Sequence, residues 1–548
     1  VDNPDQPASR ASYVPTTSSA KYLPRIGHHV YNGSAWVNEG LLAESEARTN
    51  LFHYSHDFSN SYWGKAQLTV TADQGIAPDG TDTAFKLTEN SATNVARHIT
   101  KGGGTLANST QYTAAVYLKK GTRTKAKINI FTGAASHTGK YDIENGTVNS
   151  SIGAEAATIE DVGNGWFRCS ITSTTSASGT PNVAFGMLPD DYSTTWDGDG
   201  SSYIYAWGAT LEASPTRSSY IPTTGAATVT RASESFTIPS ANLPWPEPNY
   251  IGSELVTNGD FSSSDDWIQH TTWNISGGVA THSATSGGGL SQAWTPTAGS
   301  VYEITFTITG ATSGNAYYAF SSASGLVANQ IKGVTRTTNG TYKEYIVADA
   351  TTTYHGVWGT STFDGSVDNV SVREIDPLSV SIAMDGRMTY ADEDAYATVK
   401  PFEWRASSTN LIMHTVTTNS TYKGRFILIQ EANDDYQQVD SGGSDVLSPD
   451  VLVPFNTASR HTSVSANFAV DGTDYTANTS IAALPDLSSA SLDLAETYMG
   501  TIGTFRVWDR DIADTGLVEA TNPSLEPSLS LTFEGVGTNS FVVNDWSN

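Results

Sequence analysis

The sequence predicts an all-β protein built from tandem β-sandwich domains. Short apolar stretches alternate with a period of two, as a half-buried strand requires, and the stretch 301–308 is the clearest example. Clusters of Gly, Ser, Asn and Thr separate these stretches at short intervals, which is typical of two-sheet sandwiches. A chain of 548 residues is too long for a single core. We therefore expect three to four domains.

Composition excludes several classes of partner. The formal net charge is −27, from 56 acidic and 29 basic residues, so a polyanion would be repelled and nucleic acid is not an expected partner. No apolar run approaches the roughly 20 residues that span a bilayer, so membrane insertion is not expected. The single cysteine, Cys169, excludes an internal disulfide framework. Its alternating context, GWFRCSIT, predicts a buried thiol rather than a nucleophile.

A first jelly roll is expected over residues 49–224. Its strand candidates include 111–120, 125–131 and 202–213, and one face of the first would carry Tyr112, Ala114, Val116 and Leu118. Residues 1–48 have too few apolar residues for a core, so we expect a linker or attachment segment there. They contain ASRASYVPTTSSA (8–20), which returns as PTRSSYIPTTGAA (215–227) at the end of this module. The repeat and the absence of an initiator Met indicate a further module upstream or on another chain.

A second jelly roll is expected over residues 252–375. It opens with ELVTNGDFSSSDDW, where Phe261 and Trp267 should pack near the start of the module, and closes with GSVDNVSVREI. One face of the strand 301–308 should be buried, and the closing strand should bury valines on the face opposite Val367. These residues are Tyr302, Ile304, Phe306 and Ile308 in the first strand, and Val370 and Val372, alternating with Asn369 and Ser371, in the second.

A C-terminal sandwich is expected over residues 376–548, with strands at 378–384, 410–416, 425–431, 458–473 and 500–509. Between the jelly rolls, residues 225–251 hold one strand candidate, SFTIP (235–239), and then the stiff LPWPEPNY. One strand cannot form a domain. We therefore expect SFTIP to belong to the C-terminal sandwich, with the second jelly roll inserted in it, and a proline-stiffened linker is the alternative.

Several of these motifs resemble known families. The LVTNGDF…W opening and the VDNVSV close resemble carbohydrate-binding modules of the family four and nine type, which are β jelly rolls. The C-terminal order, with ASRH…NFAVDG before GTIGTFRVWD, resembles a laminin-G or concanavalin-A-like sandwich. The runs 39–51 and 204–234 and the ending 527–548 resemble tail proteins of bacteriophages and prophages.

The sequence does not predict catalysis. It has no G-x-S-x-G, H-E-x-x-H, Walker A or dinucleotide-binding motif. The nearest paired carboxylates, Glu374 and Asp376, lie at a module junction and lack the third acid of the glycosidase strand that they resemble. The jelly-roll resemblance implies a structural Ca²⁺ between the first turn and the last strand, which nominates Asp260 and Asp368. Ser262 stands where that family often has an acid.

Aromatic side chains are the candidates for ligand binding. Sugar rings have apolar C–H faces that stack on flat aromatic groups beside a few hydrogen-bonding partners. We assign Trp166, Trp207 and Trp267 to cores. The candidates for carbohydrate binding lie near predicted loops, namely Trp294, Tyr317, Tyr318, Tyr354 and Trp358 in the second jelly roll, and Trp63, Tyr192 and Trp196 in the first.

The resemblances and the absence of a catalytic set favour one function. We expect a component of a phage virion tail, such as a fibre or spike, that binds bacterial surface polysaccharide without catalysis. Such a protein would lie outside the cell on the virion, contact other tail proteins and form a homo-oligomer, with a trimer favoured. The alternatives are a carbohydrate-binding or adhesin region of a bacterial secreted protein, and a purely structural virion protein.

Overall fold

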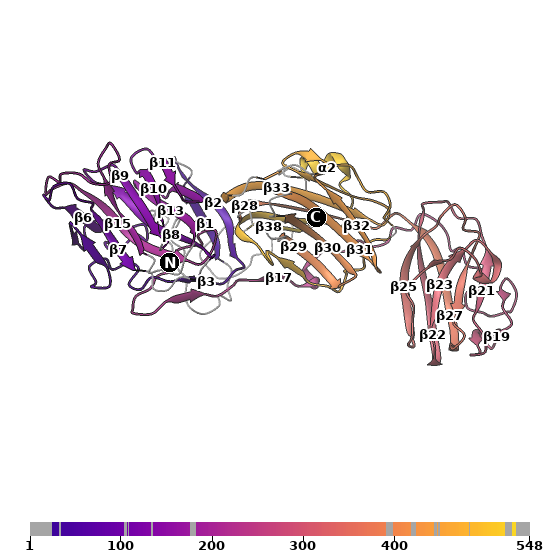
Figure 1. The fold of residues 1–548 in the computed structure, drawn as a ribbon. Coiled ribbons are helices and arrows are strands. Elements are labelled where there is room, and N and C mark those ends of the chain that lie inside the picture. The colour runs from indigo at the N-terminus through magenta and orange to yellow at the C-terminus, as the bar shows by residue number, and fades with distance from the viewer. Residues whose placement is uncertain are drawn as a thin grey trace.

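The computed structural model describes residues 25–31, 34–102, 107, 109–132, 135–175, 182–390, 398–417, 424–442, 446–447, 450–481, 483–520 and 529–532. Three β-sandwich bodies lie in a row, and the C-terminal sandwich is in the middle (Figure 1). Neighbouring strands pair in antiparallel ladders, and α2 (Ala513–Glu519) is the α-helix of the described part of the chain. The expected all-β fold class is confirmed. No described helix has the length and apolarity needed to cross a membrane.

The first jelly roll extends from β3 (Arg48–Asn50) to β16 (Val229–Arg231), which pair with each other at its base. Its main sheets have six strands each. One has the order β12 (Ala156–Asp161), β13 (Trp166–Thr174), β8 (Gln111–Lys120), β15 (Tyr203–Glu212), β6 (Phe85–Glu89), β5 (Leu68–Thr71). The other has the order β11 (Thr147–Ile152), β10 (Ser136–Asp142), β9 (Lys125–Phe131), β14 (Asn182–Leu188), β7 (His98–Gly102), β4 (Gly64–Ala66).

The core of the first jelly roll lies between these sheets. The expected face of β8 is buried there, since Tyr112, Ala114, Val116 and Leu118 all belong to the core cluster. Cys169 lies on β13, is fully buried and has a pKa that burial raises, as its strand context predicts. Burial of this apolar face is the main favourable contribution to the stability of the module.

The second jelly roll extends from β18 (Ile268–Gln269) to β27 (Asp364–Ile375). Its sheets have five strands each. The first, here called the outer sheet, has the order β18, β21 (Gly288–Ala293), β26 (Tyr354–Gly359), β23 (Ala316–Ser321), β24 (Ile331–Lys332). The other has the order β19 (Trp273–Ser276), β20 (Val279–His282), β27, β22 (Val301–Ser313), β25 (Gly340–Val347).

The closing strand β27 departs from simple alternation. Val367, Val370 and Val372 are all buried, although Val367 was expected on the opposite face from the other two. The pairing of β22 with β27 shifts register between Thr305 and Thr307, and Asn369 has a left-handed φ of 53° at this point. This irregularity inserts one residue and changes which positions face the core, so the prediction of strict alternation was wrong here.

The C-terminal sandwich is assembled from three separate stretches of the chain. Its larger sheet has the order β1 (Arg25–Tyr31), β2 (Trp36–Glu44), β37 (Met499–Trp508), β28 (Ser379–Tyr390), β33 (Asp450–Thr462), β34 (Ala466–Val470), β35 (Thr473–Asp474), with β38 (Leu529–Thr532) also paired to β37. Its other sheet has the order β17 (Phe236–Ile238), β36 (Leu492–Leu494), β29 (Thr398–Ser407), β30 (Asn410–Thr417), β31 (Arg425–Ala432), β32 (Asp435–Asp440).

The expectation that residues 1–48 form only a linker is therefore corrected. β2 pairs with β37 across more than 450 positions of sequence, with Leu41 opposite Ile502. Leu41 and Ala43 are fully buried in the core of the C-terminal sandwich, because their apolar face is completed by strands that the local sequence does not reveal. The repeat copy at 8–20 lies outside the described residues.

Both jelly rolls interrupt this sandwich. The first is inserted between β2 and β17, and the second between β17 and β28. β17 covers the SFTIP segment and pairs with β36, as the sequence-based insertion predicts. At the base of the first jelly roll, Glu44 and Arg231 form a buried ion pair at 2.6 Å. At the base of the second, Val301 and Ile375 pack into the core of the sandwich.

Candidate functional site

Two of the aromatic residues that were expected to bind sugars lie inside the sandwiches. Trp63 is 2% exposed, packs edge-on against Phe52 and Phe58, and donates its indole N–H to the Tyr54 carbonyl at 3.0 Å. Tyr318 is fully buried, with its hydroxyl 2.6 Å from His355 Nδ1. Neither ring presents a face to solvent. Both expectations are corrected. Tyr318 occupies an inward position of β23 and Trp63 lies in the opening turns of its module, and both rings fill the core.

Trp294 also serves mainly to close the core of the second jelly roll. It is half-buried and lies just after β21, with ring centroids 4.7 Å from Tyr302, 5.0 Å from Phe320 and 5.0 Å from His355. Three rings therefore occupy its surroundings and leave little of its face for a ligand. The expected core residues Trp166, Trp207 and Trp267 are buried, as predicted.

The remaining three candidates of the second jelly roll share the outward face of the outer sheet. Tyr317 lies on β23, and Tyr354 and Trp358 lie on β26 at alternate positions, opposite in direction to the core residue Val357. Trp358 is directly opposite Tyr317 on one side and Gly289 on the other. Because Tyr317 is 7% exposed while Tyr354 and Trp358 are half-buried, the latter two are the rings that a ligand can reach.

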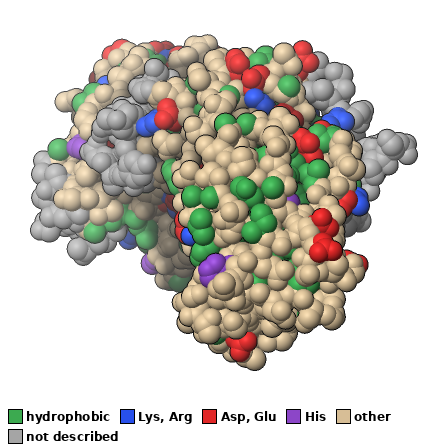
Figure 2. All heavy atoms as spheres, turned by 90° about the vertical axis from the view of Figure 1, so that its right-hand side faces the viewer, with side chains coloured by type: hydrophobic (Ala, Val, Ile, Leu, Met, Phe, Trp, Pro, Cys, Tyr) green, Lys and Arg blue, Asp and Glu red, His purple; other side chains and the backbone are tan. Residues whose placement is uncertain are grey.

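Glycines keep this face flat beside Trp358. A Cβ atom at Gly287 would lie 3.2 Å from the Trp358 ring, so the indole ring lies close over a backbone without side chains. In the middle of the face, the row of residues across β21, β26 and β23 is also small, consisting of Ser291, Gly356 and Ala319. Figure 2 turns the second jelly roll toward the viewer and shows hydrophobic side chains gathered in the middle of the visible face, with acidic side chains toward its margin.

A loop around the short helix η2 (Ser324–Leu326) lies across the small middle row. Leu326 is fully buried against Tyr317 and Ala319, and the backbone N–H of Gly325 donates to Ser291 Oγ at 2.9 Å. The Tyr317 hydroxyl donates to Gln330 at 3.0 Å at the end of this loop. The loop therefore divides the face into a Trp358 end and a Tyr354 end, about 13 Å apart along the strand.

Sequence reasoning missed this loop and the glycines below it. The signal that could have found them is the run of three glycines at 287–289, two of which lie in β21, since a glycine in a strand often marks the close approach of another backbone. At Gly289 the backbone of the η2 loop does approach this closely, because a Cβ atom there would lie 2.2 Å from the Gly325 carbonyl oxygen.

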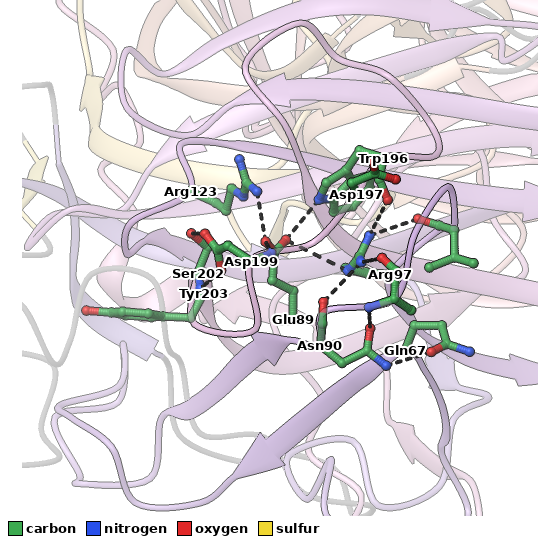
Figure 3. Close-up of polar contacts among 12 residues, drawn as sticks. Gln67, Glu89, Asn90, Arg97, Arg123, Trp196, Asp197, Asp199, Ser202 and Tyr203 are labelled. Atoms are coloured by element: carbon green, nitrogen blue, oxygen red, sulfur yellow. Dashed lines mark hydrogen bonds and ion pairs between the residues drawn. The ribbon is translucent and has the colours of Figure 1, made fainter.

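In the first jelly roll, a buried carboxylate holds the Trp196 loop. Glu89 is 1% exposed and accepts hydrogen bonds from the Trp196 indole N–H at 2.9 Å and the Asp199 backbone N–H at 3.0 Å (Figure 3). Arg123 forms an ion pair with the same carboxylate at 2.8 Å. The guanidinium of Arg97, which is fully buried, lies 4.6 Å from the Trp196 ring centre. Trp196 thus has a structural role at this position, and its indole N–H and one face are already in use.

The acidic loop TWDGDGS is likewise satisfied by its own neighbours. Hydrogen bonds from Ser202 and Ser201 hold the pKa of the Asp199 carboxyl below its usual value. Asp197 accepts the backbone N–H of Asn94 at 2.8 Å. Tyr192, at the other end of this loop, is half-buried and has a left-handed φ of 58°. Of the two expected aromatics, Tyr192 is therefore the one less firmly held, since its ring contact is with the Lys125 ammonium at 5.8 Å and its side chain makes no hydrogen bond to a buried carboxylate among the described residues.

The two carboxylates nominated for calcium lie where the turn meets the last strand. The backbone N–H of Val370 donates to the Gly259 carbonyl at 2.9 Å, which joins these segments. Asp260 accepts the backbone N–H of Ser262, and Asp368 that of Asn369. No group of three acidic, His or Cys side chains suited to a metal ion exists among the described residues. The protein thus supplies two carboxylates already engaged with backbone donors, and calcium binding stays a prediction.

No family model and no curated protein sequence matches the chain. Among solved structures, the CBM40 domain of the Ruminococcus gnavus IT-sialidase is similar at 11% identity over 27% of this chain and 83% of that chain, with a TM-score of 0.21. The tandem CBM22-1–CBM22-2 domain of Paenibacillus barcinonensis Xyn10C is similar at 12% identity over 60% of this chain and 98% of that chain, with a TM-score of 0.19. A leech intramolecular trans-sialidase is similar at 13% identity over 27% of this chain and 24% of that chain, with a TM-score of 0.21. Scores this low carry no argument about function, which rests on the residues of the chain itself.

Proposed function

We propose that the protein binds carbohydrate without catalysing a reaction, and that the outward face of the outer sheet of the second jelly roll is a binding surface. The observation that carries this proposal is the placement of Trp358 and Tyr354, with reachable rings, on the outward side of one sheet, at the two ends that the η2 loop leaves open. An indole or phenol ring on such a face stacks against the apolar C–H face of a sugar.

Polar groups beside the rings could orient a bound sugar. The Lys332 ammonium lies 5.1 Å from the centre of the Tyr317 ring, next to Trp358, and Lys332 is exposed on the edge strand β24. Gln330 accepts a hydrogen bond from the Tyr317 hydroxyl and donates one to the Leu326 carbonyl, which holds Tyr317 in place beside Trp358. A saccharide stacked on Trp358 would therefore have the Lys332 ammonium near its hydroxyl groups. The Trp358 end is better equipped than the Tyr354 end.

A glycan array with the full chain and two variants tests the proposal. Trp358→Ala removes the platform at a half-buried position, and each stacked ring contributes on the order of 1 kcal/mol, so the signal should fall about fivefold or more. Tyr436→Ala is the matched control, because Tyr436 is a 49% exposed aromatic residue on the C-terminal sandwich. Unchanged binding of every glycan by Trp358→Ala and Tyr354→Ala, with both variants folded, would show that this face is not the site.

We further propose that the glycan is a bacterial surface polysaccharide and that the protein is part of a phage tail, outside the cell and oligomeric. This finer proposal is supported by the tail-protein resemblance of the runs 39–51 and 204–234 and by the tandem sandwich architecture. Adsorption of phage to its host in the presence of purified chain is the test. Competition by the wild-type chain but not by Trp358→Ala supports it, and the absence of competition by wild type contradicts it.

A further inference from the structure

Three basic side chains meet on the outward face of the second six-stranded sheet of the first jelly roll. Lys140 on β10 is directly opposite Lys127 on β9, and Lys127 is directly opposite Gly186 on β14 (β9 and β10 are labelled in Figure 1). Their inward neighbours Ala126 and Ile128 belong to the core, so Lys127 faces away from it. Paired positions of this kind place Cβ atoms about 5 Å apart.

Gly186 brings the third basic group to this position. A Cβ atom at Gly186 would lie 2.8 Å from the Cα atom and 3.1 Å from the Cβ atom of His98. Only a residue without a side chain lets the start of β7 cross β14 this closely. His98 consequently lies next to Lys127, and the three residues Lys140, Lys127 and His98 are called the basic cluster below.

Lys127 is unusual within the cluster because it is 8% exposed. No hydrogen bond or ion pair joins its ammonium group to another residue in the described part of the chain. The stem of Lys127 is enclosed, whereas its ammonium group is not among the fully enclosed polar atoms of the described residues; the Nδ1 atom of His98 is, and it has no hydrogen-bond partner. Partial desolvation of one cation beside another costs free energy. Burial and then the charge of Lys140 lower the pKa of Lys127, and burial and then the charge of Lys127 lower the pKa of His98 to about 4.

Nearby acids do not compensate this charge. Asp142 is two residues beyond Lys140 on β10 and forms a 2.6 Å ion pair with Lys125, which lies directly opposite it. Asp191 is exposed, accepts hydrogen bonds from Ser193, and interacts with Lys140 rather than Lys127. In a chain of net charge −27, a group of cations without a carboxylate partner at its centre is a local exception that favours an anion.

An aromatic ring borders the basic cluster. Lys140 Nζ donates to the Tyr192 carbonyl at 3.0 Å, which holds the loop after β14 beside the cluster. The Tyr192 ring lies 5.8 Å from the ammonium of Lys125, the neighbour of Lys127 on the same face of β9. A cation, a second cation, an imidazole and an aromatic edge together match a sugar ring that carries a carboxylate.

We propose that the first jelly roll binds an acidic saccharide at the basic cluster, with the sugar carboxylate taken up by Lys127 and His98 and the ring placed beside Tyr192. This inference deepens the proposed carbohydrate binding, but it concerns a different module and does not depend on Trp358. His98 and Lys140 are half-buried, so the cluster can be reached from solvent.

The test uses the full chain on an array of saccharides that carry uronic or sialic acids, each printed beside its uncharged counterpart. Lys127→Met should weaken binding of acidic saccharides about 10- to 100-fold, because one charge-assisted hydrogen bond is lost. Lys120→Gln is the matched control, since Lys120 is an exposed lysine of the same module paired with Glu144. Trp358→Ala should leave the acidic signals unchanged, which separates this site from the one on the second jelly roll.

Two further measurements exclude a merely structural role for Lys127. Lys127→Met should raise the melting temperature, since the variant no longer holds a partly desolvated ammonium group beside that of Lys140, whereas a structural lysine would lower it on removal. By NMR, the pKa of His98 should rise both in Lys127→Met and when an acidic saccharide is added to wild type. The proposal is overturned if no acidic saccharide binds, if Lys127→Met binds as well as wild type, or if sodium acetate binds as tightly as the saccharides.

Discussion

Replacement of Glu89 by Gln should strongly destabilise the first jelly roll. The carboxylate accepts the Trp196 indole N–H, the Asp199 backbone N–H and an Arg123 ion pair, and Arg97 Nε lies 3.9 Å away (Figure 3). An amide keeps the volume but removes the charge and turns one acceptor into a donor. The new amide NH₂ group would then point at one of the N–H donors that the carboxylate now accepts from, and neither donor would have an acceptor in this buried site.

The size of the effect follows from burial. Glu89 and Arg97 side chains are fully buried and that of Arg123 is 18% exposed, so the loss of one partner leaves cations uncompensated at a cost of about 3–5 kcal/mol. For a domain of this size, the corresponding unfolding transition should fall by roughly 6–20 °C in differential scanning calorimetry of the full chain. Glu144→Gln is the control, because its ion pair with Lys120 is exposed on both sides and should contribute about 0–1 kcal/mol. A shift in Glu89→Gln no larger than in this control would refute the network as the anchor of the Trp196 loop.

Three further changes test other parts of the structure. Gly289→Ala should loosen the η2 loop, because the new Cβ would lie 2.2 Å from the Gly325 carbonyl oxygen. Hydrogen exchange should become faster at residues 322–330. The control Gly225→Ala, whose new Cβ would have no atom within 4 Å, should leave the exchange rates unchanged. Burial lowers the pKa of His414 to about 3. In the unfolded chain the His414 imidazole takes up a proton near pH 6.5, whereas in the folded protein it does so only near pH 3. The free energy of unfolding should therefore fall by about 1.4 kcal/mol per pH unit between these values. A His414→Gln variant whose acid denaturation is equally steep would contradict this. Cys169 is fully buried with a raised thiol pKa, so it should react with a thiol reagent only after denaturant unfolds the first jelly roll, and native-state labelling would contradict this.

Local patterns were enough to predict the sandwiches themselves. The alternate residues of the strand at 301–308 are each at most 2% exposed, namely Tyr302, Ile304, Phe306 and Ile308. Successive side chains of a strand point to opposite faces of the sheet, so a period-two apolar pattern identifies the buried face. The pattern failed at β27, where the irregularity at Asn369 brings Val367 to the core face as well. A bulge depends on the partner strand, and that partner is not visible in the local sequence.

Long-range pairing was the main limit for the fold and the candidate site. β2 contains Leu41 and Ala43, whose burial requires β37 at the far end of the chain. Among the aromatics, sequence alone could not separate Tyr317 and Tyr318, which are adjacent on β23 and face opposite sides of the sheet. The basic cluster was hidden for the same reason, since Lys127 and Lys140 meet only through strand register.

The three-part assembly of the C-terminal sandwich sets an order of events during synthesis. β1 and β2 leave the ribosome before both jelly rolls, yet their partner β37 emerges only after about 450 further residues have been made. Each jelly roll, in contrast, has its strands within one contiguous stretch and can close as soon as that stretch is free. The nascent chain would then contain two folded jelly rolls and the β1–β2 hairpin, whose apolar side is still exposed to solvent. Translation arrest before residue 499 would leave that hairpin open to pairing with other strands, so this hairpin is the part of the nascent sandwich that chaperones have most need to protect.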